Sequence, residues 1–293
     1  MNKSFSRRQV IKIGILAAIG SSIAKNSSAT FANTANYNEV KDPWKGFKVG
    51  VASYTFRKMS LEDTIKALQK LDLKYISIKD SHLPLTSTTE ERRAAMQKIK
   101  DGGITPLSCG NITMENDEVN IRQAFEYARD CNFPTIVCSP HPDSMPILDK
   151  MVKEFDIKLA IHNHGPEDKR FPSPYDVWKS VEKYDKRIGL CIDVGHTARA
   201  KVDPAEAIVK CKDRLYDCHF KDIESTEPKA GTIQAGRGVL DLASILQSLL
   251  KIRYPYLLSF EYESSPDDPF AEFAENVGYT KGLLEGITRD KKK

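Results

Sequence analysis

Hydrophobic and polar positions follow one another along most of the chain in a pattern typical of strands that alternate with helices. From residue 47 on, short apolar runs of strand length are followed by longer segments in which apolar residues recur at spacings of three and four. The strands are predicted at residues 47–53, 74–79, 104–108, 135–139, 158–162, 188–192, 214–220 and 256–260. The helices are predicted at residues 60–71, 88–100, 116–131, 144–155, 173–184, 203–211, 241–252 and 269–284.

Eight strands that alternate with eight helices favour a closed parallel (β/α)8 barrel, an α/β fold, over a doubly wound sheet. A dinucleotide-binding sheet would carry a glycine-rich fingerprint after its first strand, and the segment that follows residue 53 lacks one. Several predicted helices begin with a capping residue such as Ser60 or an early proline such as Pro204. We therefore expect one barrel domain over residues 47–288, preceded by a linker over residues 36–46.

The first 35 residues resemble a twin-arginine export signal. The motif Ser6-Arg7-Arg8-Gln9-Val10-Ile11-Lys12 precedes an apolar segment, residues 13–23, that is short and rich in Ala, Gly and Ser. Small-residue sites ending at Ala29, Ala32 and Ala35 are candidates for cleavage. We expect a periplasmic mature protein with no stable membrane span, and a retained N-terminal anchor is the alternative.

Loss of this segment changes the charge of the chain. The whole sequence has a formal charge of +4, and residues 1–38 contain five basic residues and no acidic one, so the mature charge is about −1. Nothing then favours a polyanion, and no nucleic-acid partner is expected. The six cysteines form no Cys-x-x-Cys pair and three of them lie in apolar runs. We expect buried, reduced thiols, with a disulfide as the alternative.

A carboxylate follows the sixth predicted strand. The apolar run over residues 188–192 ends at Asp193, and a small-residue turn at Gly195 leads to His196. In a parallel barrel, the first charged residue after a buried strand marks the C-terminal rim, where functional residues gather. Glycine lets the backbone turn sharply, so that both polar side chains face one cavity. The alternative is that Asp193 caps the next helix and His196 lies on the surface.

All histidines of the chain lie at or just beyond the C-terminal end of a predicted strand. They are His82, His141, His162, His164, His196 and His219. Other strand ends contribute further charged residues, namely Lys79, Glu167, Lys221, Glu261 and Glu263. Imidazole and carboxylate ligands suit a borderline divalent ion such as Mn²⁺, Zn²⁺, Co²⁺ or Fe²⁺. Such an ion can polarise the carbonyl group of a small hydroxy-carbonyl substrate.

Four short motifs occur in barrel order along the chain. They are Ile192-Asp193-Val194-Gly195-His196, His219-Phe220-Lys221-Asp222, Gly236-Arg237-Gly238-Val239-Leu240-Asp241 and Ser259-Phe260-Glu261. Over roughly residues 47–285 the chain resembles the xylose isomerase-like TIM barrel superfamily. That superfamily includes sugar-phosphate isomerases and epimerases, tagatose-type epimerases, inosose and dehydroshikimate dehydratases and endonuclease IV. The resemblance implies metal ligands after strands five to eight, and the last three map onto Asp193, His219 and Glu261.

The first of these ligands departs from the family pattern. Many relatives have Glu-Asn-His after strand five, whereas this chain has His162-Asn163-His164. In the branch that it resembles, Glu167 would replace the missing carboxylate, and we favour it as the fourth ligand, with His162 as the alternative.

Roles in proton transfer are predicted for His164 and Lys221, because imidazole titrates near neutral pH and a nearby cation lowers the pKa of a lysine. Substrate binding is predicted for His162, His196, Arg237, His141 and Lys79. For His196, a role as ligand or as a residue that orients a ligand stays open. For Arg237, an ordinary surface position is the alternative.

We therefore expect an exported, divalent-metal-dependent enzyme that enolises a sugar or keto-sugar, of the isomerase or epimerase type, with a small carbohydrate as its partner. A homo-oligomer is compatible with the sequence. The first alternative is a hydratase or lyase acting on 3-keto sugars or 3-keto-glycosides. The others are a non-catalytic carbohydrate-binding barrel and an endonuclease-like phosphodiesterase, for which His82 and His141 would supply extra ligands. The near-neutral mature charge counts against the phosphodiesterase.

Overall fold

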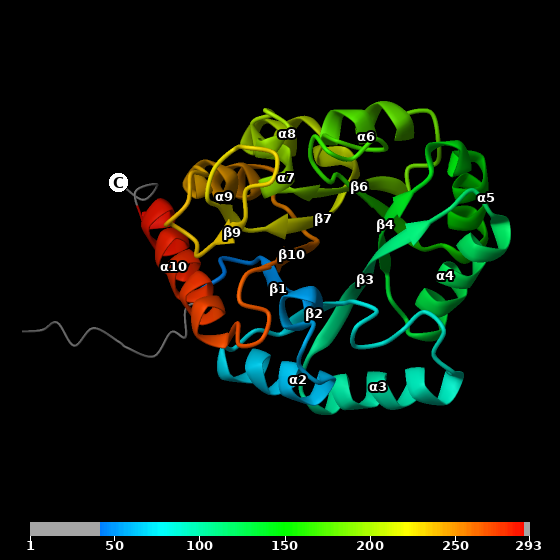
Figure 1. Ribbon diagram of the computed structural model, residues 1–293, viewed down its shortest axis with the longest axis horizontal. Helices are drawn as coiled ribbons and strands as arrows, with labels where there is room; N and C mark the ends of the chain where they lie inside the picture. The colour runs from blue at the N-terminus through cyan, green and yellow to red at the C-terminus, as the bar shows by residue number, and fades with distance from the viewer. Residues whose placement is uncertain (1–41, 290–293) are drawn as a thin grey trace, which may run out of the picture. The chain divides into compact units, whose positions relative to one another are not determined.

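The computed structural model describes residues 42–289, and their strands form a closed barrel in the order β1-β10-β7-β6-β5-β4-β3-β2 (Figure 1). Every neighbouring pair of barrel strands is parallel. The strands are β1 (Lys48–Ala52), β2 (Tyr75–Ile78), β3 (Thr105–Met114), β4 (Thr135–Pro140), β5 (Lys158–His162), β6 (Ile188–Asp193), β7 (Leu215–Phe220) and β10 (Leu257–Phe260). The predicted (β/α)8 fold is confirmed.

Helices surround the barrel and connect its strands (Figure 1). They are α2 (Leu61–Lys70), α3 (Thr89–Asp101), α4 (Glu118–Asp130), α5 (Met145–Phe155), α6 (Pro174–Val181), α7 (Val194–Arg199), α8 (Pro204–Lys210), α9 (Leu242–Lys251) and α10 (Phe270–Arg289). Short 3-10 helices lie at Ser53–Phe56, Pro142–Ser144 and Lys212–Arg214. None of the helices in the described part is long and apolar enough to cross a membrane.

The apolar runs of the sequence become strands that are covered on both faces. Every residue of β4, β6 and β7 is buried, which is why these segments lack the polar alternation of a half-exposed sheet. Capping residues define where helices begin. At the start of α3, the side chain of Thr88 accepts from the backbone amide of Glu91, and the side chain of Glu91 accepts from the backbone amide of Thr88. Asp203 accepts hydrogen bonds from two backbone amides at the start of α8.

The strand β3 extends six residues beyond its predicted end at residue 108. At Gly110 the backbone has φ +123°, and a Cβ atom would lie 2.0 Å from the carbonyl oxygen of Val137, so only glycine fits there. The register against β4 shifts between Cys109 and Ile112. The extra length carries Asn111 to the mouth of the barrel. Helix α7 and the antiparallel pair β8 (Asp222–Ile223) and β9 (Thr232–Ile233) were not predicted either.

The N-terminal boundary of the barrel lies before residue 47. Residues 42–46, assigned to the linker from sequence, form a turn, and Trp44 in that turn is buried. Its ring packs edge-on against Phe260 of β10, with ring centroids 6.2 Å apart. The predicted export signal and residues 36–41 of the linker lie outside the described residues.

A buried arginine holds the chain between α6 and β6. The guanidinium of Arg214 donates hydrogen bonds to five backbone carbonyl oxygens, those of Val181, Glu182, Tyr184, Asp185 and Ile188, at 2.8–3.2 Å. Those groups include the end of α6, where carbonyl oxygens have no partner within the helix. Arg214 directly precedes β7 and therefore links the start of this strand to the end of α6 and the start of β6.

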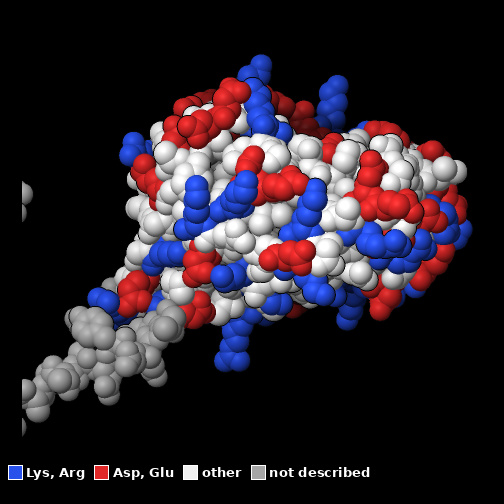
Figure 2. All heavy atoms as spheres, turned by 90° about the horizontal axis from the view of Figure 1, so that it is seen from below, with Lys and Arg blue, Asp and Glu red and all other residues white. Residues whose placement is uncertain are grey.

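Charges of both signs are interspersed on the face of the molecule that Figure 2 shows. The surface ion pairs of the described residues include Arg122 with Glu154 and Lys150 with Glu118. A duplex or single-stranded nucleic acid would instead require a continuous basic surface. This face offers none.

Candidate functional site

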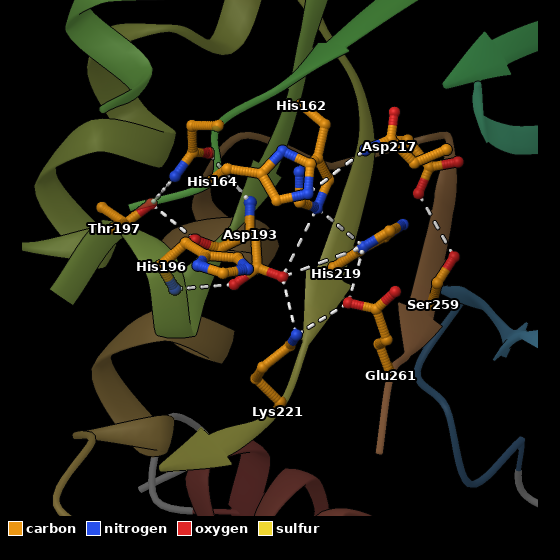
Figure 3. A network of polar contacts seen from close by, with 12 residues as sticks. His162, His164, Asp193, His196, Thr197, Asp217, His219, Lys221, Ser259 and Glu261 are labelled. Carbon is orange, nitrogen blue, oxygen red and sulfur yellow. Dashed lines mark hydrogen bonds and ion pairs between the residues drawn. The ribbon is translucent and has the colours of Figure 1, made fainter. Parts of the chain in front are cut away.

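Four side chains meet at the C-terminal end of the barrel, as Figure 3 shows. They are His162 of β5, Asp193 of β6, His219 of β7 and Glu261, which directly follows β10. The parallel register brings them to one level, since Asp193 pairs with His219 and the amide of Glu261 donates to the carbonyl of Phe220. We call these residues the four-residue cluster.

The distances within the four-residue cluster are short. The Nε2 atom of His162 lies 3.0 Å from Nδ1 of His219, which lies 3.1 Å from Oε2 of Glu261. The Oδ2 atom of Asp193 lies 3.5 Å from Nε2 of His162 and 3.8 Å from Nδ1 of His219. Two ligands that each lie about 2.1 Å from an ion are themselves roughly 3 to 3.5 Å apart. Two imidazoles and two carboxylates at these separations therefore fit a divalent ion.

Asp193 has a separate contact for each carboxylate oxygen. Its Oδ1 atom accepts a hydrogen bond of 2.7 Å from the amide of His196 and caps α7. Its Oδ2 atom is buried, lies 2.9 Å from the ammonium of Lys221 and faces the other members of the four-residue cluster. Asp193 therefore begins a helix and also lies in the cluster, whereas His196, expected on the surface in the alternative interpretation, lines the cavity.

Lys221 lies among three carboxylates next to the cluster. Its Nζ atom is 2.9 Å from Asp193, 2.7 Å from Glu261 and 2.6 Å from Glu263. Burial opposes the charge of the ammonium, but these carboxylates raise the pKa of Lys221 well above its ordinary value. With no ion in the cluster, the ammonium of Lys221 is thus held in its charged form. The close approach requires Gly195, where a Cβ atom would lie 2.9 Å from the lysine side chain.

Two further histidines, His164 and His196, lie beside the cluster. The ring of His164 is 4.4 Å from that of His162 and 5.2 Å from that of His196, between centroids. Its Nδ1 atom lies 3.2 Å from the hydroxyl of Ser139. Burial and the neighbouring His162 lower the pKa of His164 to about 4, so its imidazole is neutral near pH 7.

His196 is also held neutral. Burial lowers its pKa to about 2, with further contributions from nearby cations. The guanidinium of Arg199 lies 2.9 Å from its Nδ1 atom, and because arginine can only donate, Nδ1 acts as the acceptor. The proton of the neutral ring is therefore on Nε2. This polar, uncharged ring lines the cavity.

His219 differs from these neutral rings. Burial alone would lower its pKa, but Glu261, Asp217 and Asp193 together raise the pKa to about 9. Asp217 is itself buried below the site, where Ser108 and Ser259 donate hydrogen bonds to its two oxygens. Sequence reasoning did not include Asp217, because it lies inside an apolar strand, two positions before His219.

A cavity of about 350 Å³ adjoins the cluster and opens at the barrel mouth. It is lined by Tyr54, Lys79, Asn111, Thr113, His162, His164, His196, Glu261 and Glu263. The ammonium of Lys79 donates a hydrogen bond of 2.6 Å to the carbonyl of Asn111. Lys79, His162 and His196 thus lie where substrate binding was predicted. Thr113 was missed because β3 was predicted to end before it.

Three residues predicted for the site lie away from it. Glu167, favoured as the fourth ligand, is exposed and does not belong to the cluster, so the geometry favours the alternative, His162. His141 caps the 3-10 helix after β4 and does not line the cavity. Arg237 is exposed and forms a two-pronged ion pair with Glu275 of α10.

Two residues support the site without lining the cavity. The side chain of Asn163 accepts from the amide of Asp193 and donates to the hydroxyl of Thr197, each at 3.1 Å. Asp222 accepts three amide hydrogen bonds from the glycine-rich loop at residues 236–240. Their places inside the motifs His-Asn-His and Lys-Asp were the available signals in the sequence.

Similarity to known proteins agrees with this architecture. The rhizopine catabolism protein MocC of Rhizobium meliloti is 29% identical over 157 residues, which cover 48% of this chain and 46% of MocC, so the match spans less than half of that relative. The structure of an L-ribulose 3-epimerase has a TM-score of 0.69 at 18% identity and covers 83% of this chain and 96% of its own. The structure of the 3-keto-D-glucoside 4-epimerase of E. coli has a TM-score of 0.67 at 14% identity and covers 80% of this chain and 98% of its own.

At these identities the solved structures establish a shared fold. The family itself follows from a match over residues 31–283 to the family described as xylose isomerase-like TIM barrel. That match covers most of the barrel and all four motifs noted in the sequence. This chain therefore belongs to the xylose isomerase-like TIM barrel family.

Proposed function

We propose that this protein is an exported, divalent-metal-dependent enzyme that enolises a sugar or keto-sugar and releases an isomer or epimer. The observation that carries the proposal is the four-residue cluster at one side of a polar cavity, with the neutral His164 beside it. The similarity to sugar epimerases supports a carbohydrate substrate. Export is proposed from the twin-arginine motif and the apolar segment after it.

The ligands in this proposal are His162, Asp193, His219 and Glu261. When bound, the ion would polarise the substrate carbonyl and make the neighbouring C–H group more acidic. His162, Asp193 and His219 are buried and Glu261 is partly buried, which limits the access of water and strengthens their interaction with charge.

The remaining side chains divide the proton transfers between them. His164 is uncharged near pH 7 and lines the cavity, so it can accept a proton from substrate carbon. Lys221 remains protonated and can donate to, or stabilise, a developing negative oxygen. Lys79 and the amide of Asn111 offer hydrogen bonds to sugar hydroxyls.

Elimination of water is the second candidate reaction. The observation in its favour is again Lys221, whose protonated ammonium suits a general acid for a departing hydroxyl. Both reactions begin with removal of a proton from carbon, so one experiment can separate them.

The test uses the protein without residues 1–35, loaded with Mn²⁺ and incubated in D₂O with a panel of free and 3-keto sugars. We expect deuterium at a carbon next to the carbonyl, detected by NMR and mass spectrometry. His164→Ala should lose exchange while keeping the ion, and His141→Ala, outside the cavity, is the matched control. Loss of water from the sugar would identify the eliminating enzyme. Sugar binding without exchange would identify a binding protein, and no binding or exchange across the panel would overturn the proposal.

A further inference from the structure

A second cavity, of about 250 Å³, lies beside the cavity of the cluster. Lys79, Asn111 and Thr113 line both of them. Lys79 directly follows β2, and Asn111 and Thr113 lie on the extended part of β3. The two cavities are therefore neighbours across one shared wall at the barrel mouth.

The walls of the two cavities differ in chemistry. Apart from the three residues of the shared wall, the second cavity is lined mainly by apolar side chains. They are Ile78, Leu83, Leu85, Ile112 and Tyr127. The hydroxyl of Tyr127 already donates to the carbonyl of Leu83, at 3.0 Å, so the tyrosine offers its ring rather than a free polar group. The cavity of the cluster has no aliphatic side chain in its lining.

The difference between the two linings indicates which chemical groups each cavity can bind. A free monosaccharide carries hydroxyl groups on all sides, and an apolar wall would leave those groups without partners. A group without hydroxyls gains free energy from burial against the same wall. An apolar cavity of about 150 Å³ is enough to hold benzene, so the second cavity has room for a six-membered ring.

We propose that the second cavity is a subsite for an apolar group attached to the sugar, such as a phenyl aglycone. The substrate would then be a glycoside whose sugar ring occupies the cavity of the cluster. The shared wall, where Lys79 donates to the carbonyl of Asn111, is where the glycosidic bond passes. This inference rests on the proposed function, because it assigns a substrate class to the same site.

The first test compares methyl and phenyl β-D-glucosides and their 3-keto forms by calorimetry with the Mn²⁺-loaded protein. Burying roughly 60 Å² more apolar surface corresponds to about a tenfold gain in affinity. We expect the phenyl glycosides to bind about tenfold more tightly than the methyl glycosides. Equal affinities would overturn the subsite.

A variant that fills the cavity provides the second test. Leu85 is half-buried in the loop between β2 and α3, and Leu85→Trp should abolish the phenyl preference while methyl-glycoside affinity stays within twofold. Val119→Trp adds the same ring on the exposed side of α4 and is the control. A preference that survives Leu85→Trp would overturn the subsite. Sugars that exchange deuterium with no phenyl preference would overturn the subsite alone, whereas no binding of any sugar would overturn the enzymatic function as well.

Discussion

The Nε2 atom of His162 and the Nδ1 atom of His219 face each other at 3.0 Å, with a carboxylate oxygen on either side. Two bare nitrogen lone pairs at this distance repel each other, so a proton or a metal ion must lie between the groups. Without an ion, His219 keeps its proton, because the surrounding carboxylates raise its pKa to about 9. An ion and this proton therefore compete for the same atom.

The first prediction concerns the pH dependence of metal binding. A pKa raised to about 9 means that His219 is protonated below that pH, and the ion must displace the proton. Affinity for Mn²⁺ should rise with pH by up to about tenfold per unit and level off near pH 9. Calorimetry in buffers of different ionisation enthalpy should count about one released proton at pH 7. An affinity that does not change between pH 6 and pH 9 would contradict the competition.

The second prediction identifies the fourth ligand. His162→Ala should weaken Mn²⁺ binding by about 100-fold or more, because a buried donor, one of the four in the cluster, is lost. Glu167→Ala should leave the affinity within about twofold, since Glu167 is exposed outside the cluster. Calorimetry on the two variants compares them directly. The reverse order of effects would restore Glu167 as the ligand.

The third prediction concerns Lys221. Lys221→Met removes the ammonium that neutralises Asp193 and Glu261, and we expect deuterium exchange to fall about 100-fold or more. Mn²⁺ affinity should be retained or increased, because a competing positive charge is gone. Lys150→Met, on the surface of α5, is the control for the loss of a lysine. Unchanged exchange in Lys221→Met would remove this residue from the reaction.

The fourth prediction concerns stability. Arg214→Met leaves five carbonyl oxygens near the end of α6 without their donor and should lower the free energy of unfolding by about 3 kcal/mol. Arg122→Met, which breaks a surface pair with Glu154, should lower it much less. Urea unfolding followed by circular dichroism measures both. Similar losses of unfolding free energy in the two variants would show that the hydrogen bonds of Arg214 stabilise the fold no more than a surface ion pair does.

Most of the barrel could be predicted from the sequence, because the spacing of apolar residues in its strands and helices matches the faces that are buried. It failed where a strand continued through polar residues, as at Asn111 in β3, and where a helix was too short to show a period, as in α7. The predicted strand therefore ended at residue 108, two residues before Gly110. Tertiary contact with β4, which sequence spacing does not contain, supports the remaining residues.

The site was predictable wherever a strand end fixed a residue's position. Asp193, His219 and Glu261 follow from this rule and lie together in the structure. The rule does not apply to side chains on loops. The direction of Glu167 depends on a turn, and Arg237 forms an ion pair with Glu275, which is 38 positions away in the sequence. The carboxylates around Lys221 were not predicted as its neighbours for a related reason, because they come from separate strands.

The two contacts of Asp193 restrict how this position can change. Asparagine would keep an oxygen for the amide of His196 but remove the charge, and glutamate would keep the charge on a longer stem that no longer suits the start of α7. In the proposed function, redesigning this residue to alter the ion preference would thus also disturb the ring of His196. Specificity for the ion and the shape of the cavity would then change together through one side chain.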